Sequence, residues 1–281
     1  MRRFVSLSSV LLILGCPQGS VAQQPRPSPQ QGAIVITARV KDALRDFVQS
    51  LSRVGPTGQI ARWDGQVCPT VVGIDPGQAR FVEDRIGEIA RTVRLRPGGS
   101  NCLTSMVVVV TPSPNEFAAE LVRQNTITLR DNGASNVKRF ASSSDPVRWI
   151  SVSDECGGGC ELPNTRLLKS TKPTLRAMVI VIDASRIGSY SLGELSDFVA
   201  LVGLSNPPAD RHRPQRSILS MFDGQREPGC PFRLTPYDRS FPSGLYGTAL
   251  DDGAGQQLST IANHMKKDVV SEHPDSQCPA R

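Results

Sequence analysis

Two runs of aliphatic residues dominate the hydrophobic pattern of the chain. Ser105–Thr111 and Ala177–Asp183 each hold an apolar stretch that is rich in β-branched residues and too short for a helix. Such runs are typical of strands that are buried on both faces. Val147–Ser153 predicts a third strand with Trp149 on one face, and Ala33–Thr37 predicts a short β-like segment.

Apolar residues at helical spacing predict helices between and after these strands. The clearest of them begins at Asp75 and places Phe81 and Ile86 on its inward side, whereas the polar stretch Asp131–Asp145 predicts irregular structure. Helices and strands mix without strict alternation, so the pattern favours an α+β fold. The predicted helices are Val40–Val54, Asp75–Leu95, Glu116–Gln124, Leu192–Val202, Arg216–Asp223, Leu234–Tyr246 and Gln256–Asp268.

The beginning of the chain has the features of an export signal. Arg2 and Arg3 precede an apolar stretch, and small residues before residue 23 suit a signal peptidase. We therefore expect a signal peptide over 1–22, a disordered linker over 23–32, one α+β domain over 33–270 and a tail over 271–281. The expected location is the periplasm or the extracellular medium. Cleavage before Cys16, with a lipid anchor on its sulfur, is the alternative, and the apolar stretch is too short for a membrane span.

The cysteine content agrees with export. The chain has seven cysteines, and the six beyond Cys16 are an even number, as disulfide-bonded exported proteins usually have. The spacing favours three pairs: Cys68–Cys102, Cys156–Cys160 across a glycine loop, and Cys230–Cys278. A metal site at the Cys156 loop is the competing interpretation. The net charge of +6 is scattered along the chain, which argues against a nucleic-acid partner.

Residues Leu192–Leu204 carry the most specific motif in the sequence. In zinc metallopeptidases two histidines one helical turn apart bind the metal, and the glutamate after the first histidine is the general base. When Gly203 is aligned with the glycine that follows this motif, the ligand positions hold Ser196 and Ala200, and the base position holds Asp197. Neither the serine hydroxyl nor the alanine side chain is a useful zinc ligand, so the motif predicts no metal.

Four short motifs resemble an uncharacterised family of exported proteobacterial proteins with a zincin-like domain. In chain order they are Val202-Gly203-Leu204-Ser205-Asn206, Ser217-Ile218-Leu219, Leu234-Thr235-Pro236-Tyr237-Asp238 and Leu245-Tyr246. The resemblance implies a degenerate zincin-like core over about 105–247, with Val147–Ser153 as the edge strand beside the central helix. An unrelated α+β domain would show the same apolar residues.

Two functions follow from the resemblance and the residues. The first is non-catalytic binding or scaffolding of a peptide or an envelope glycan in a vestigial groove lined by Arg148, Trp149, Ser196 and Ala200. The second is hydrolysis without zinc at Ser196, Asp197 and Asp238. The three histidines have no i, i+4 spacing, and no motif predicts a cofactor.

Overall fold

A computed structural model describes residues 29–98, 102–129, 132–155, 171–209, 213–223 and 232–271. The chain separates into two compact units, Met1–Ala38 and Arg39–Arg281. The first unit contains the beginning of helix α1 (Pro29–Leu51), which continues into the second. The second unit contains all the other elements and is described below. Among the described residues, no helix is both long enough and apolar enough to cross a membrane.

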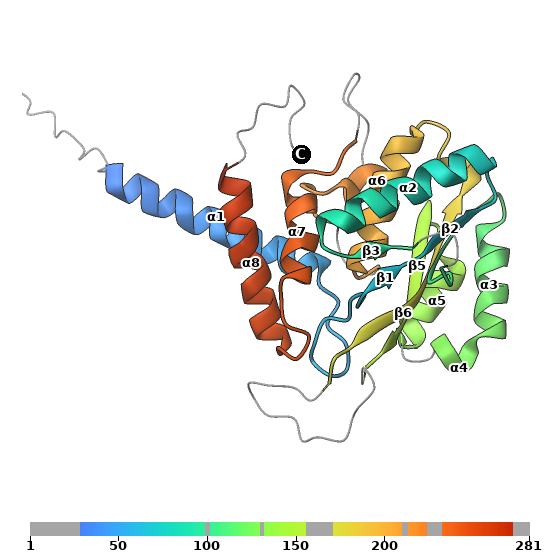
Figure 1. Ribbon diagram of the computed structural model, residues 1–281. Helices are drawn as coiled ribbons and strands as arrows, with labels where there is room; N and C mark the ends of the chain where they lie inside the picture. Colours follow the sequence, from blue (N-terminus) through green and yellow to red (C-terminus); the bar gives the residue numbers. More distant parts are fainter. Residues whose placement is uncertain are drawn as a thin grey trace, which may run out of the picture. The chain divides into compact units, whose positions relative to one another are not determined.

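A four-stranded mixed sheet lies at the centre of the second unit (Figure 1). Its order is β2 (Pro69–Val72), β4 (Met106–Thr111), β6 (Thr174–Asp183) and β5 (Val147–Asp154). The strands β2, β4 and β6 are parallel, and β5 joins β6 in the antiparallel direction. Strand β5 is therefore an edge strand. A separate parallel pair is formed by β1 (Gln66–Val67) and β3 (Arg96–Pro97).

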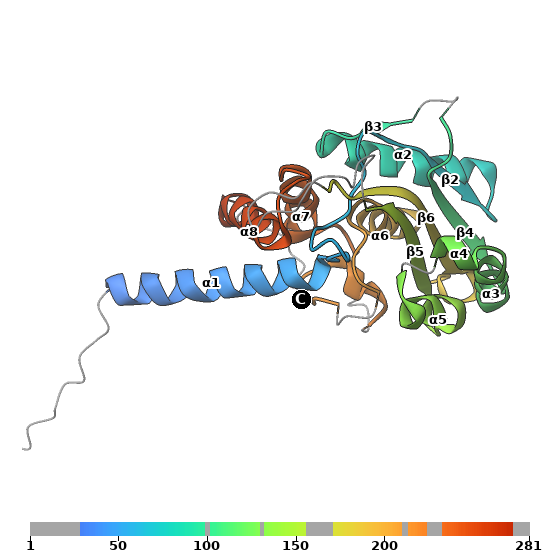
Figure 2. The same cartoon turned by 90° about the horizontal axis from the view of Figure 1, so that it is seen from below.

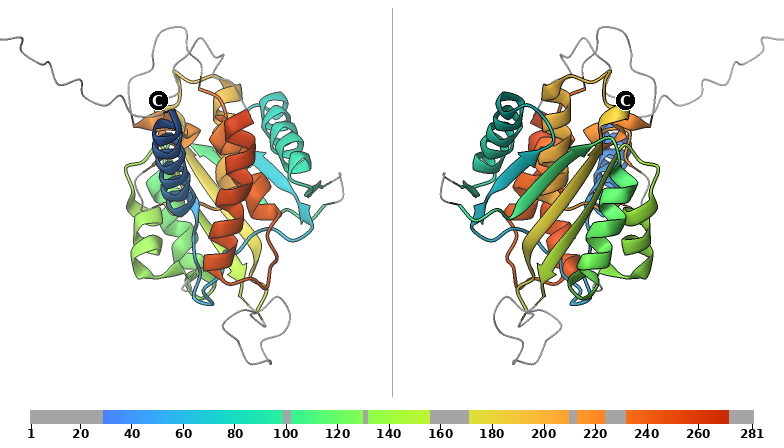
Figure 3. Two further views of the ribbon diagram at one scale, coloured as in Figure 1. Left: turned by 90° about the vertical axis from the view of Figure 1, so that its left-hand side faces the viewer. Right: turned by 90° about the vertical axis from the view of Figure 1, so that its right-hand side faces the viewer.

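Helices cover both faces of this sheet (Figures 2 and 3). One face packs in the larger core with helices α2 (Pro76–Thr92), α6 (Leu192–Ser205), α7 (Pro236–Tyr246) and α8 (Ala254–Ser271). The other face packs in a smaller core with α3 (Pro114–Gln124), α4 (Thr126–Leu129) and α5 (Ala134–Ser142). The 3-10 turns η2 (Ala184–Arg186) and η3 (Ile218–Phe222) complete the described elements. The mixed α and β architecture confirms the predicted class.

Helix α6 is buried on every side. It begins at a capping box in which Ser191 accepts from the amide of Glu194, while the Glu194 carboxylate accepts from the amide of Ser191. Every residue from Glu194 to Ser205 is buried, and the helix ends where Asn206 adopts a left-handed conformation with φ of 46°. The sequence predicts this helix and its cap, and the structure extends it by one turn.

Three predictions of local structure are wrong. Residues 33–37 lie within helix α1, and neither described sheet contains a strand to pair with them. Helix α5 occupies the stretch that was expected to be irregular, because its single buried residue, Phe140, anchors it in the smaller core. On α2, Ala79, Val82 and Ile86 point inward, whereas Phe81 is 50% exposed.

One of the predicted disulfides lies within the described residues. Cys68 and Cys102 are bonded, with their Cα atoms 5.9 Å apart. The bond closes the segment that contains α2 and leads into β4. Cys16, Cys156, Cys160, Cys230 and Cys278 lie outside the described residues.

Candidate functional site

The two positions that would hold zinc ligands are enclosed in the core. Ser196 and Ala200 are fully buried on α6. The Ser196 hydroxyl donates to the carbonyl of Leu192 one turn earlier, at 2.6 Å. Neither residue lines either of the two pockets described below. The groove expected at Ser196 and Ala200 is therefore filled by core packing, because every residue of α6 from Glu194 to Ser205 is buried.

The carboxylate of Asp197, at the position that the sequence alignment matches to a general base, is held in an ion pair. Asp197 accepts from Nε of Arg85 on α2 at 2.7 Å, and the same guanidinium contacts Glu88 at 3.0 Å. The hydrogen bond from Arg85 to Asp197 raises the pKa of the arginine. Asp197 therefore links α6 to α2.

The third candidate carboxylate is a buried helix cap. Asp238 accepts from the Ser217 hydroxyl, from the amide of Ile218 at 2.8 Å and from the amide of Thr235 at 3.0 Å. Burial raises the pKa of Asp238 to about 6, although these hydrogen bonds favour the charged form. The partners of Asp238 differ from those of Ser196 and Asp197, so the structure does not join the three into a catalytic group.

The described residues contain no group of three or more His, Cys, Asp or Glu side chains placed to hold a metal ion. His264 is paired with Asp268 at 3.3 Å, one turn further along α8. His212 and His273 lie outside the described residues.

Aromatic side chains satisfy the carbonyl groups at the buried end of α6. The last carbonyls of a helix have no partner within it, and burial makes an unpaired carbonyl costly. The indole N–H of Trp63 donates to the carbonyl of Gly203 at 2.8 Å. The hydroxyl of Tyr246 donates to the carbonyl of Leu204 at 2.7 Å. Trp149 on β5 donates to the carbonyl of Pro207 at 2.8 Å. Trp149 thus fixes the edge strand to the chain that leaves α6.

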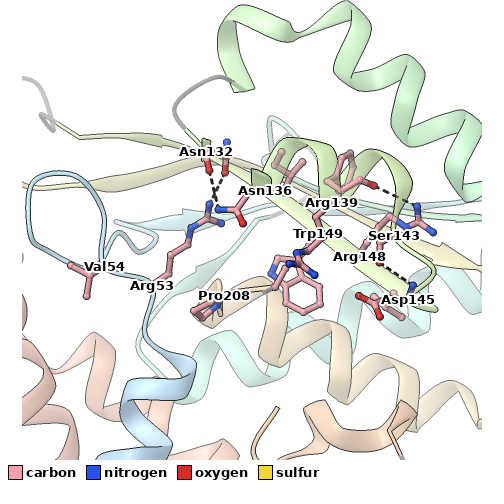
Figure 4. A pocket seen from close by; sticks show the side chains of 14 residues that line it. Arg53, Val54, Asn132, Asn136, Arg139, Ser143, Asp145, Arg148, Trp149 and Pro208 are labelled. Atoms are coloured by element: carbon pink, nitrogen blue, oxygen red, sulfur yellow. Dashed lines mark hydrogen bonds between the residues drawn. The ribbon is translucent and has the colours of Figure 1, made fainter. Parts of the chain in front are cut away.

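A pocket of about 210 Å³ lies against the free edge of β5 (Figure 4). Its floor is Val147–Ile150, and Pro208 lies close to Trp149. Arg53, Asn132 and Asn136 lie together at one end, and Asp145 and Arg148 lie towards the other. The remaining lining residues are Val54, Arg139, Phe140, Ser143 and Ala209. Of the residues predicted to form a groove, Arg148 and Trp149 line this pocket.

Backbone groups of β5 face this pocket. The amide of Asp183 on β6 donates to the carbonyl of Pro146. Backbone groups alternate in direction along an antiparallel strand, so those of Pro146, Arg148 and Ile150 point to β6. Val147, Trp149 and Ser151 therefore present theirs to the outer edge. The Ser151 carbonyl accepts from Asn132 at 2.8 Å. Among the described residues, the backbone groups of Val147 and Trp149 have no partner on this side.

The opposite edge of the sheet is protected. Strand β2 has only four residues, and its outward positions are Pro69, which has no amide hydrogen, and Val71. The amide of Val71 donates to the carboxylate of Glu83 on α2 at 2.8 Å. The edge of β5 is longer and lacks this protection at its centre.

Arginine side chains give the pocket at β5 a positive character. Arg53 donates to Asn132 at 2.9 Å. Arg139 is exposed on α5, and its guanidinium has no partner in the described part of the chain. Arg148 is buried and donates to Asn115 and to the carbonyl of Phe140, while its Nε is unpaired; desolvation lowers its pKa. Among the lining residues that the structure describes, Asp145 is the only acidic one.

Sequence reasoning missed Arg53, Asn132 and Arg139. They come from the segment that follows α1 and from α5 and its preceding turn, and they belong to no motif. Searches of protein-family models, of curated proteins and of solved structures each gave no match to this chain. The geometry of the site is accordingly the basis for the function proposed below.

Proposed function

We propose that this chain is an exported, non-catalytic protein that binds an extended peptide segment along the free edge of β5. The observation that carries the proposal is the unpaired backbone of Val147 and Trp149 at the floor of the pocket. An extended segment supplies donors and acceptors at the same repeat and extends the sheet by one strand. A glycan does not repeat its hydrogen-bonding groups at strand spacing, so we favour a peptide.

The pocket also suits a segment better than a free small molecule. Its volume of about 210 Å³ is below the roughly 300–1,000 Å³ of sites that enclose drug-sized ligands. A strand laid along the edge needs room only for the side chains that point inward. The exposed Arg139 and the partly buried Arg53 favour an acidic side chain at one of those positions.

A zincin-like origin is part of the proposal. A mixed sheet with an antiparallel edge strand, next to a helix that carries Ser196 and Ala200 at the ligand positions, supports it. The hydrolase alternative finds less support, because Ser196 and Asp238 are enclosed and Asp197 is paired with Arg85. The variant Asp197→Asn separates the two functions: it leaves peptide binding unchanged, whereas a hydrolase that used Asp197 as its base would lose turnover.

Amide exchange measured by NMR tests the proposal directly. The probe is the capped peptide Ac-Glu-Val-Glu-Val-Glu-NH2, compared with its counterpart in which lysine replaces glutamate. In the free protein the amides of Val147 and Trp149 should exchange much faster than those of Arg148 and Ile150, which face β6. The acidic peptide should slow the exchange of Val147 and Trp149. Four backbone hydrogen bonds contribute roughly 2–6 kcal/mol, so we expect a dissociation constant on the order of 1 mM or somewhat below.

A matched pair of variants on α5 tests the role of charge. Arg139→Gln should weaken binding of the acidic peptide several-fold, because its guanidinium lines the pocket. Lys138→Gln removes the same charge from the exposed neighbouring residue, which does not line the pocket, and should have little effect. Equal binding of the lysine peptide, or slowed exchange away from β5, would contradict the proposal.

A further inference from the structure

A second cavity, of about 220 Å³, lies on the opposite side of β6 from β5. Its base is formed near the carboxyl ends of the parallel strands by Val71, Val110 and Ile182. Its sides are formed by Val82 of α2 and by Leu195 and Val199 of α6. The carboxyl ends of parallel strands are a common place for ligand sites in open α/β sheets. The cavity lies at this end of the sheet.

Rigid backbone structure holds the walls of this cavity in place. After β2 the chain turns at Gly73, whose φ is +89°; a Cβ atom there would lie 2.0 Å from the carbonyl oxygen of Val110. The turn before α2 is thus packed directly against β4. On the other wall, the capping box of Ser191 and Glu194 fixes the start of α6. The cavity is preformed, so binding of a ligand would not include a free-energy cost for opening it.

The lining of the cavity is almost entirely apolar. Its polar side chains are Gln78, which is exposed, and Tyr190, whose hydroxyl donates to the carbonyl of Met221 at 3.1 Å. An ordered water needs two to four polar partners. The interior between the valine and leucine side chains offers no such set. An apolar molecule is therefore the occupant that this chemistry favours.

We propose that this cavity binds a small apolar molecule with the size of one substituted aromatic ring. A well-studied apolar cavity of roughly 150 Å³ in another protein binds benzene, and the cavity here is larger. A methyl-substituted ring would contact the strands on one side and both helices on the others. The exposed Gln78 amide at the cavity could accept or donate one hydrogen bond to a polar substituent. This site shares no lining residue with the pocket at β5 and does not depend on the function proposed there.

Toluene is the probe for the test, with methyl chemical shifts as the readout. Titration should give saturable shifts of the methyl groups of Val108, Val110, Leu195 and Val199, with a dissociation constant in the millimolar range or below. Val199→Met fills part of the cavity with a flexible side chain and should weaken binding at least tenfold. The matched control is Val179→Met, on the face of β6 that packs in the smaller core, and it should change the affinity less than twofold.

A second variant covers the case in which Val199→Met does not fold. Gln78→Trp changes an exposed residue of α2 that lines the cavity and should slow or block entry of toluene. Three results would overturn the proposal. They are the absence of saturable shifts up to the solubility limit of toluene, shifts that spread equally over both cores, and saturable binding of octanoate in place of toluene. The first result would leave the cavity without a ligand. The last would show that the cavity binds a linear aliphatic molecule and not an aromatic ring.

Discussion

The buried carboxylate of Asp238 makes stability depend on pH in a direction that is unusual for an aspartate. Its pKa is raised from 3.8 to about 6 by burial. The folded state therefore binds a proton more tightly than the unfolded state does. Stability from this group is present below pH 3.8 and is lost as the pH rises towards 6. The difference between the two pKa values corresponds to about 3 kcal/mol.

Urea denaturation of the native sequence and of Asp238→Asn at several pH values isolates this effect. Asparagine does not titrate. Its oxygen can accept from the amides of Ile218 and Thr235, which both donate to one carboxylate oxygen of Asp238, but its NH2 group then takes the place of the oxygen that accepts from the Ser217 hydroxyl. The variant should therefore be less stable at pH 4. The stability advantage of aspartate over asparagine should then shrink by up to about 3 kcal/mol between pH 4 and pH 7. All other carboxylates are common to both proteins and cancel in the comparison.

The variant Ser217→Ala sharpens the test. The Ser217 hydroxyl donates to Asp238 and so favours its charged form. Its loss should raise the pKa of Asp238 further and shift the pH window upward. An advantage of aspartate over asparagine that grows between pH 4 and pH 7 would refute the reasoning, because the hydrogen bonds would then outweigh burial.

Two further predictions concern the ties that hold the second unit together. Tyr246→Phe removes the donor to the carbonyl of Leu204 at the buried end of α6 and should lower the free energy of unfolding by about 1–3 kcal/mol. Urea denaturation measures the loss, and an unchanged midpoint would contradict the prediction. Cys102→Ser opens the bond to Cys68, which spans 34 residues, and should cost about 4 kcal/mol in the same assay. Treatment of the native protein with a reductant should give a loss at least as large, because it opens this bond and any other disulfide of the chain, and a loss confined to the variant would point to altered packing instead.

Much of the fold was predictable because local signals agreed with the final packing. The valine-rich runs became β4 and β6, and Ser191 with Glu194 marked the start of α6. Helix α5 was missed because it buries only Phe140, so its stability comes from packing under β5 and not from its own pattern. Phe81 was assigned to the core by spacing alone, and spacing does not reveal which neighbour covers a helix.

The candidate site was less predictable, since its residues are distant in sequence. The strand that forms its floor could be recognised, but Arg53 and Arg139 approach it only through the tertiary fold. The placement of Ser196 and Ala200 in a groove relied on the alignment with a metal-binding motif. The sequence around them already contained a contrary signal: apolar residues occur on every side of α6, and a helix with that pattern lies inside a protein.

The aromatic donors at the end of α6 also bear on how the chain folds. They join Gly203 to Trp63 across 140 positions, Pro207 to Trp149 across 58 and Leu204 to Tyr246 across 42. The end of this helix is complete only when segments from the start, middle and end of the domain have arrived. Contacts this distant in sequence form slowly, because long loops must close first. We therefore expect the last turn of α6 to order late in refolding, and an incomplete chain during synthesis to expose this helix until Tyr246 has emerged.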